Sequence, residues 1–158
     1  MFGSFIYCPQ KYTLDTILTY VEDDEQVMLK NGICYCKIGY YDRTIIYCYG
    51  NAGTMLDMLP IARRLSERNR VNVVLFDYPG YGASEGEPSE ENIINALRKV
   101  RLEFDKVEMI GESIGSGVVL SYMFKYRDQG VEKIYLLSAF TSLINVVSEN
   151  SLVGFLFY

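Results

Sequence analysis

Residues 107–120 constrain the fold of this chain more than any other segment. They read Val-Glu-Met-Ile-Gly-Glu-Ser-Ile-Gly-Ser-Gly-Val-Val-Leu. A short strand-like run leads into Gly111-x-Ser113-x-Gly115, and apolar residues then recur at helical spacing. This order predicts a strand, a tight turn that carries a serine, and a helix, the arrangement known as a nucleophile elbow.

The glycines of such a turn have a steric reason. Strand and helix crowd together there, so the positions two before and two after the serine must be small, as Gly111 and Gly115 are. The serine backbone is strained and its hydroxyl is pushed clear of the sheet. The amides that begin the helix point at the serine and would stabilise an oxyanion there. The simpler alternative is an ordinary strand–turn–helix unit in which Ser113 only caps the helix.

Strands and helices are expected to alternate along the 158 residues. Residues 13–22 and 32–39 are predicted to form two strands of a meander, joined by an acidic turn at 22–25. Further strands are predicted at 44–49, 72–76, 107–110 and 134–137, and helices at 57–68, after Ser89, after Ser113 and at 141–149. The alternation predicts an α/β fold, a doubly wound and mostly parallel sheet, within a single domain over 1–158.

Charge and hydropathy exclude some partners. The net charge is −5, and the basic residues at 63–64 and 98–101 lie on predicted helices, where we expect them on solvated faces. Nucleic acid is therefore not an expected partner. No apolar run approaches the ~20 residues that a transmembrane helix requires.

The cysteines at positions 8, 34, 36 and 48 lack the C-x₂-C spacing typical of zinc sites. We expect reduced thiols that serve packing, and no metal or other cofactor. The first residues do not resemble a secretory leader, so a cytoplasmic location is expected.

Three loops are predicted at the carboxyl edge of the sheet, where ligands of such folds bind. The first contains Gly50, Asn51, Ala52 and Gly53, whose backbone can approach a substrate closely. The amide of Asn51 is predicted to form an oxyanion hole with that of Ile114. The second loop spans 77–88, and the third is the elbow. Neither the dinucleotide fingerprint nor the phosphate-loop motif is present.

Three motifs carry a resemblance to a known family. They are Tyr49-Gly50-Asn51-Ala52-Gly53, Asp77-Tyr78-Pro79-Gly80-Tyr81-Gly82-x-Ser84-x-Gly86, and Gly111-x-Ser113-x-Gly115-Ser116. With this spacing the chain resembles the α/β-hydrolase superfamily, and within it the serine-aminopeptidase-like branch that includes the α/β-hydrolase-domain depalmitoylases. The resemblance implies Ser113 as nucleophile, with the amides of Asn51 and Ile114 as oxyanion donors. The family usually has histidine where this chain has Tyr49.

The other catalytic groups of that family are not found. In its fold the serine is followed along the chain by an acid and then a histidine, but this sequence contains no histidine. Asp128 and Glu132 are expected at the opposite end of the sheet, as are Lys125 and Lys133. The position after the strand at 134–137, where some relatives carry the acid, reads Ser-Ala-Phe.

Two functions remain open from the sequence. The first is a serine hydrolase of esters or thioesters, acting on a small molecule or an acylated protein. It would have its fold truncated after the sixth strand and its activity impaired by the absent acid and histidine. The second is a non-catalytic α/β-hydrolase-like binding protein or decayed remnant. An open edge at 134–137 also predicts self-association.

Overall fold

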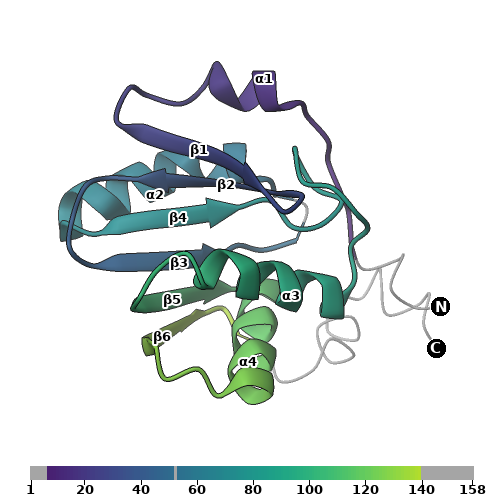
Figure 1. Cartoon of the computed structure of the whole chain (residues 1–158), viewed down its shortest axis with the longest axis vertical. Helices are drawn as coiled ribbons and strands as arrows, with labels where there is room; N and C mark the ends of the chain where they lie inside the picture. The colour runs from purple at the N-terminus through teal and green to yellow at the C-terminus, as the bar shows by residue number, and fades with distance from the viewer. Residues whose placement is uncertain (1–6, 52, 140–158) are drawn as a thin grey trace.

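A six-stranded sheet organises residues 7–51 and 53–139, the part of the chain that the computed structural model describes (Figure 1). Its strands are β1 (Glu25–Lys30), β2 (Ile33–Ile38), β3 (Thr44–Cys48), β4 (Asn72–Phe76), β5 (Val107–Glu112) and β6 (Val131–Leu137). The helices are α1 (Leu14–Leu18), α2 (Met55–Asn69), α3 (Glu90–Arg101) and α4 (Ile114–Tyr126).

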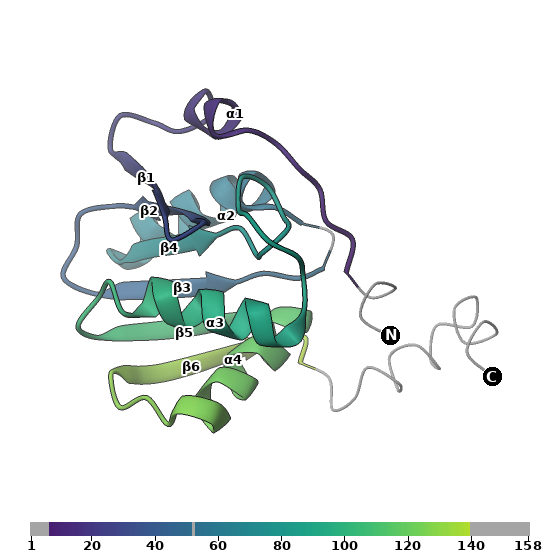
Figure 2. The ribbon, with the colours of Figure 1, turned by 45° about the vertical axis from the view of Figure 1, so that its right-hand side comes forward.

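The strand order is β1-β2-β4-β3-β5-β6. Strand β2 is antiparallel to both of its neighbours, β1 and β4. Strands β4, β3, β5 and β6 run parallel to one another. Helix α2 covers one face of the sheet, whereas α3 and α4 pack against each other on the opposite face (Figures 1 and 2). The predicted doubly wound, mostly parallel sheet is therefore confirmed.

The strand predicted at 13–22 is wrong. The side chain of Thr13 accepts a hydrogen bond from the backbone of Thr16 and begins α1, whose Ile17 is buried. The strand beside β2 is β1, joined to it by the two-residue turn Asn31-Gly32, where both residues have positive φ. This dipeptide is the strongest short-range signal for a hairpin. The acidic residues at 22–25 lead into β1 instead of joining two strands.

The other predicted elements agree closely with the structure. Helix α3 begins after Ser89, whose hydroxyl accepts from the amide of Asn92 at 3.1 Å. Helix α2 begins at Met55, earlier than expected, because the backbone and hydroxyl of Thr54 both donate to Asp57 at 2.8 Å. The helix predicted at 141–149 lies outside the described residues.

The central strands β3 and β4 are buried along their whole length, as expected for parallel strands covered on both faces. Cys34, Cys36 and Cys48 are buried free thiols in this core, and Cys8 is an exposed free thiol. Among residues 7–51 and 53–139, no group of three or more Cys, Asp or Glu side chains could hold a metal ion.

One basic residue departs from the solvated face predicted for it. Arg101 is 5% exposed, and its guanidinium lies between the end of α3 and the start of β6. Its Nε is 3.0 Å from Oδ2 of Asp128, and it also donates to the carbonyls of Phe104 and Asp105. Asp128 further accepts from the Tyr122 hydroxyl at 2.5 Å. Asp128 balances the charge of the guanidinium and the carbonyls accept from its two terminal nitrogens, whereas Nε has no hydrogen-bond partner among the described residues.

A second polar network joins Arg43, the residue before β3, to β5 and β6. Glu108 is 5% exposed and accepts from Arg43 at 2.7 Å and from the Tyr135 hydroxyl at 2.8 Å. Burial by itself raises the pKa of Glu108, but the hydrogen bonds and charge of Arg43, with the Tyr135 hydroxyl, outweigh it and hold that pKa below its ordinary value.

Strand β6 forms one edge of the sheet within the described residues, since β5 is its one partner there. Four large apolar side chains of this strand are between 37% and 47% exposed: Ile134, Tyr135, Leu136 and Leu137. They point alternately to the two faces, so neither face of β6 is well covered by the described helices.

Replacing Arg101 by methionine should lower the free energy of unfolding by about 3 kcal/mol, because Asp128 loses its buried counter-charge. Urea unfolding followed by circular dichroism would measure this. Arg64→Met is the matched control, since Arg64 is an exposed arginine on α2 and should change stability by no more than about 0.5 kcal/mol. Equal effects of the two variants would contradict the structural role of Arg101.

The lowered pKa of Glu108 predicts a dependence of stability on pH. A carboxyl whose pKa is depressed in the folded state stabilises that state above its ordinary pKa of 4.5, and this contribution is lost as the pH falls through the folded-state pKa. Glu108→Gln should therefore be less stable at neutral pH but lose less stability between about pH 5 and pH 3. Urea midpoints across this range would show it, and parallel curves for both proteins would contradict it.

Candidate active site

The turn between β5 and α4 has the strained backbone expected of an elbow. Ser113 has φ 52° and ψ −119°, a conformation that is costly for any residue with a Cβ. Its backbone amide donates to the carbonyl of Leu137 at 2.9 Å, and its carbonyl accepts from the amide of Ser116 at 2.9 Å. The turn is thus fixed from the end of β6 and from within α4.

The two glycines of the motif are required by close approach. A Cβ on Gly115 would overlap the carbonyl of Cys48 in β3, and one on Gly111 would lie 2.7 Å from Cα of Ser116 in α4. The Ser116 hydroxyl uses this closeness, donating to the carbonyl of Gly111 at 2.8 Å. The steric argument made from the sequence therefore holds in the structure.

Of the predicted oxyanion donors, Ile114 is the first residue of α4. An amide at that position has no partner within its own helix. The loop after β3 lies beside the serine, since a Cβ built on Gly50 would be 3.6 Å from the Cβ of Ser113. Asn51 follows Gly50, and its side-chain oxygen accepts from the Tyr81 hydroxyl at 3.1 Å.

Of the other two predicted substrate-binding residues, the structure describes Gly53. Gly53 lies against the ring of Tyr49, 3.6 Å from the position of its missing Cβ. Ala52 falls outside the described residues. The structure therefore brings together Gly50 and Ser113, whereas Gly53 faces back into the loop.

Sequence reasoning assigned no role to Asp77, which the structure places at the centre of the carboxyl edge. Its side chain is fully buried and accepts from the Tyr12 hydroxyl at 2.5 Å and from the amides of Met55 and Ala83 at 3.0 and 3.1 Å. Burial raises the pKa of Asp77, and these hydrogen bonds partly offset the rise. Its position directly after a buried strand could have indicated this role from the sequence.

Tyr49, at the position where the resemblance leads one to expect histidine, is fully buried. Its ring stacks on Tyr78 with centroids 4.7 Å apart, and its hydroxyl lies 3.4 Å from Oδ1 of Asp77. The aromatic ring is therefore part of the packing that supports the loop.

Three of the described charged groups after the serine form ion pairs away from it, as expected. Asp128 is paired with Arg101 beyond the far end of α4, Glu132 pairs with Lys106 at 2.8 Å, and Lys125 lies 3.8 Å from Glu91. Glu112 precedes the serine, but its carboxylate accepts from the Tyr47 hydroxyl at 2.6 Å.

A groove of about 670 Å³ lies away from the elbow. It lies between the β1–β2 turn, the loop after β4 and one side of α3, with Ile33, Pro79, Ala96 and Leu102 among its lining residues. None of the predicted site residues contributes to it.

Gly115→Ala should destabilise the fold by about 3 kcal/mol or more, because the new methyl group meets the backbone of β3. Gly117→Ala is the control in the same helix. Apart from its chain neighbours and its own helix backbone, a Cβ there meets no atom of the described residues within 4 Å, so the change should raise stability by about 0.5–1 kcal/mol through helix propensity. Thermal unfolding of both variants tests the crowding, and similar melting temperatures would contradict it.

Comparison with known proteins agrees with this geometry. The family model described as alpha/beta hydrolase fold matches residues 43–156. Protein YfhR of Salmonella typhi is 36% identical over 123 residues, which cover 67% of this chain and 42% of that protein. Protein bem46 of Schizosaccharomyces pombe is 32% identical, covering 66% of this chain and 37% of that protein. The chain thus spans less than half the length of these curated relatives.

Solved structures show the same fold. The thioesterase domain from the curacin biosynthetic pathway aligns with a TM-score of 0.60 and 18% identity, covering 79% of this chain and 49% of that one. An esterase from Exiguobacterium antarcticum aligns with a TM-score of 0.58 and 21% identity, covering 66% and 40%. The family match, the sheet order and the strained serine turn agree, and the chain belongs to the alpha/beta hydrolase fold family.

Proposed function

We propose that this chain supplies the nucleophile and the oxyanion hole of a serine hydrolase acting on esters or thioesters. Ser113 is the nucleophile, and the amides of Asn51 and Ile114 are the oxyanion donors. The observation that carries the proposal is the strained turn at Ser113 with Gly50 packed beside it. An esterase and a thioesterase domain among the structural neighbours support this choice of reaction.

In the proposed reaction the Ser113 oxygen attacks the acyl carbonyl and loses its proton to solvent. The carbonyl oxygen becomes an oxyanion and accepts hydrogen bonds from the two amides. The C–O or C–S bond then breaks, and the alcohol or thiol leaves with a proton from solvent. Water attacks the acyl-serine in the same way and releases the carboxylic acid.

The missing base sets the expected rate. The 158 residues contain no imidazole, and the nearby carboxylate of Glu112 is bound to Tyr47. The Ser113 hydroxyl therefore stays protonated until solvent removes its proton. An enzyme without its triad keeps a rate of roughly 10³–10⁴ over water from oxyanion stabilisation and binding, and we expect this chain to stay within that limit.

The same observations favour a second candidate, a non-catalytic binding protein of the same fold. No histidine is present, and Asp128 and Glu132 are paired with cations away from the serine. In that case Ser113 would be a relic of the fold.

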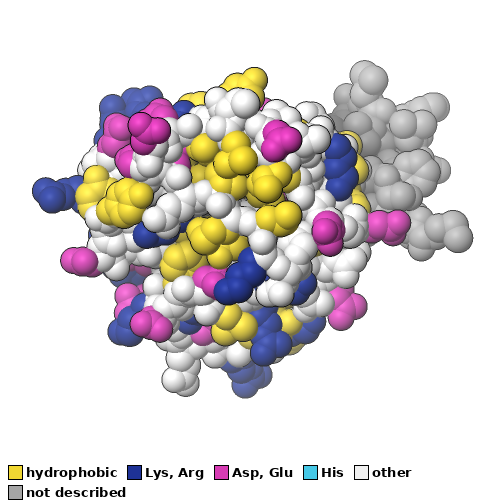
Figure 3. All heavy atoms as spheres, turned by 45° about the horizontal axis from the view of Figure 1, so that its top comes forward, with side chains coloured by type: hydrophobic (Ala, Val, Ile, Leu, Met, Phe, Trp, Pro, Cys, Tyr) yellow, Lys and Arg dark blue, Asp and Glu magenta, His cyan; other side chains and the backbone are white. Residues whose placement is uncertain are grey.

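The partners proposed are a small-molecule or acyl-protein ester and a second copy of the chain at the β6 edge. The exposed apolar residues 134–137 support self-association. On the face shown in Figure 3, charges of both signs are interspersed with apolar groups, which argues against a nucleic-acid partner.

None of the described helices is long and apolar enough to cross a membrane. The buried free thiols support a reducing compartment such as the cytoplasm.

Hydrolysis of p-nitrophenyl butyrate by the purified chain tests the reaction. We expect a slow rate above the buffer background, lost in Ser113→Ala and kept in Ser121→Ala, because Ser121 lies on α4 and contacts Glu90. Intact-mass spectrometry should detect a butyryl adduct that Ser113→Ala lacks. Equal rates for the wild type and Ser113→Ala would favour the binding protein, and rates typical of complete esterases would refute the argument from the missing base.

A further inference from the structure

Two tyrosines from the loop after β4 hold the loop after β3 on both sides of Gly50. The Tyr78 hydroxyl donates to the carbonyl of Tyr49 at 2.7 Å, and the Tyr81 hydroxyl donates to Oδ1 of Asn51 at 3.1 Å. Tyr49 and Asn51 are the neighbours of Gly50 in the sequence. The segment that lies beside Ser113 is thus held at each end.

The tyrosine hydroxyls have fixed positions because their rings are packed together. Tyr78 stacks on Tyr49 at 4.7 Å with an interplanar angle of 15°, and the ring of Tyr81 meets that of Tyr78 edge-on at 5.9 Å. Tyr78 and Tyr81 are 2% and 1% exposed. Neither ring can turn without disrupting the core beneath the loop.

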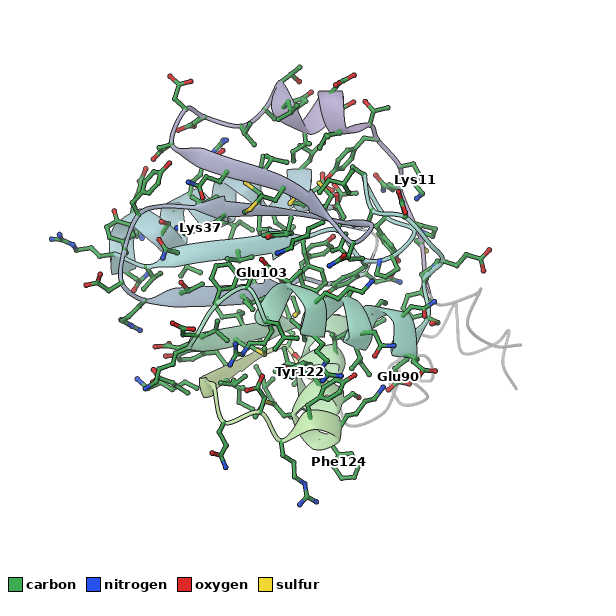
Figure 4. The ribbon with its side chains drawn as sticks, in the orientation of Figure 1. Lys11, Lys37, Glu90, Glu103, Tyr122 and Phe124 are labelled. Carbon is green, nitrogen blue, oxygen red and sulfur yellow. The ribbon has the colours of Figure 1, made fainter. Side chains whose placement is uncertain are left out.

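The segment ahead of α1 determines the direction in which the Tyr81 hydroxyl donates. The amide of Cys8 donates to this hydroxyl at 3.0 Å and makes a longer contact with Oδ1 of Asn51, at 3.4 Å. Because an amide can only donate, the tyrosine oxygen accepts from it, and its proton is left to point at Asn51. Lys11 of the same segment (Figure 4) donates at 2.9 Å to the carbonyl of Ser84, which belongs to the loop after β4.

We infer that Tyr81 is a positioning residue for the oxyanion loop, holding the Asn51 side chain so that its backbone amide keeps one orientation toward Ser113. This inference rests on the proposed function. Oxyanion donors act through fixed orientation, so a loosened Asn51 would stabilise the transition state less while ground-state binding changes little. Burial also raises the pKa of Tyr81 to about 12, and the hydroxyl therefore keeps its proton at any assay pH near neutrality.

Tyr81→Phe tests the inference because it removes the hydroxyl and keeps the ring. The Ser113-dependent rate with p-nitrophenyl butyrate should fall about tenfold, less than the 10²–10³ lost with a whole oxyanion donor. The fall should appear in kcat with KM unchanged.

Tyr122→Phe is the matched control. Tyr122 (Figure 4) is also 1% exposed, and its hydroxyl donates at 2.5 Å to Asp128, which follows the end of α4 remote from Ser113. This variant should lose stability but keep the Ser113-dependent rate. Equal losses of rate in both variants would overturn the inference, because they would show a general effect of destabilisation.

A second measurement does not need catalysis. Hydrogen exchange of the Asn51 amide, followed by NMR, should be faster in Tyr81→Phe than in the wild type and unchanged in Tyr122→Phe. If the wild type shows no Ser113-dependent rate, the proposed reaction fails while exchange still reports whether Tyr81 holds the loop. Unchanged exchange in Tyr81→Phe would overturn the inference whatever the rates.

Discussion

The buried carboxylate of Asp77 is the interaction on which the carboxyl edge of this protein depends. It binds donors from three other parts of the chain: Tyr12 ahead of α1, Tyr49 at the end of β3 and Met55 at the start of α2. It also binds the amide of Ala83 within its own loop. A carboxylate in such a place is tolerated only while its hydrogen bonds are made. This one carboxylate therefore links these three parts of the chain to the loop after β4.

A buried ion pair lies at the other end of the parallel strands, near their amino ends. Arg101 and Asp128 join the end of α3 to the connection between α4 and β6. Helix α4 thus runs from the strained serine turn to this ion pair. The two ends of the strands differ in structure. At the carboxyl ends lie loops, close contacts and the strained turn, and at the amino ends the ion pair stabilises the packing of α3 and α4.

The sequence predicted the structure best where burial or crowding leaves the backbone few allowed conformations. Apolar runs identified β3 and β4, and the glycines around Ser113 identified the turn with its crowding. It was least informative where long-range contacts decide. The burial of Arg101 depends on carbonyls brought to it by folding, and the role of Tyr81 depends on two segments far apart in the chain. The strand predicted at 13–22 failed for a local reason instead, because Thr13 caps a helix and Leu14, Ile17 and Leu18 recur at helical spacing.

Tyrosine hydroxyls donate to carboxylates at 2.8 Å or less in four pairs, Tyr12–Asp77, Tyr47–Glu112, Tyr122–Asp128 and Tyr135–Glu108. In each pair the pKa of the tyrosine is raised, first by burial in three of them and by the hydrogen bond to Glu108 in the fourth. An imidazole in the same place would gain or lose its proton near neutrality. The tyrosines of these four links therefore keep their protons through the modest acidification and alkalinisation that living cells undergo.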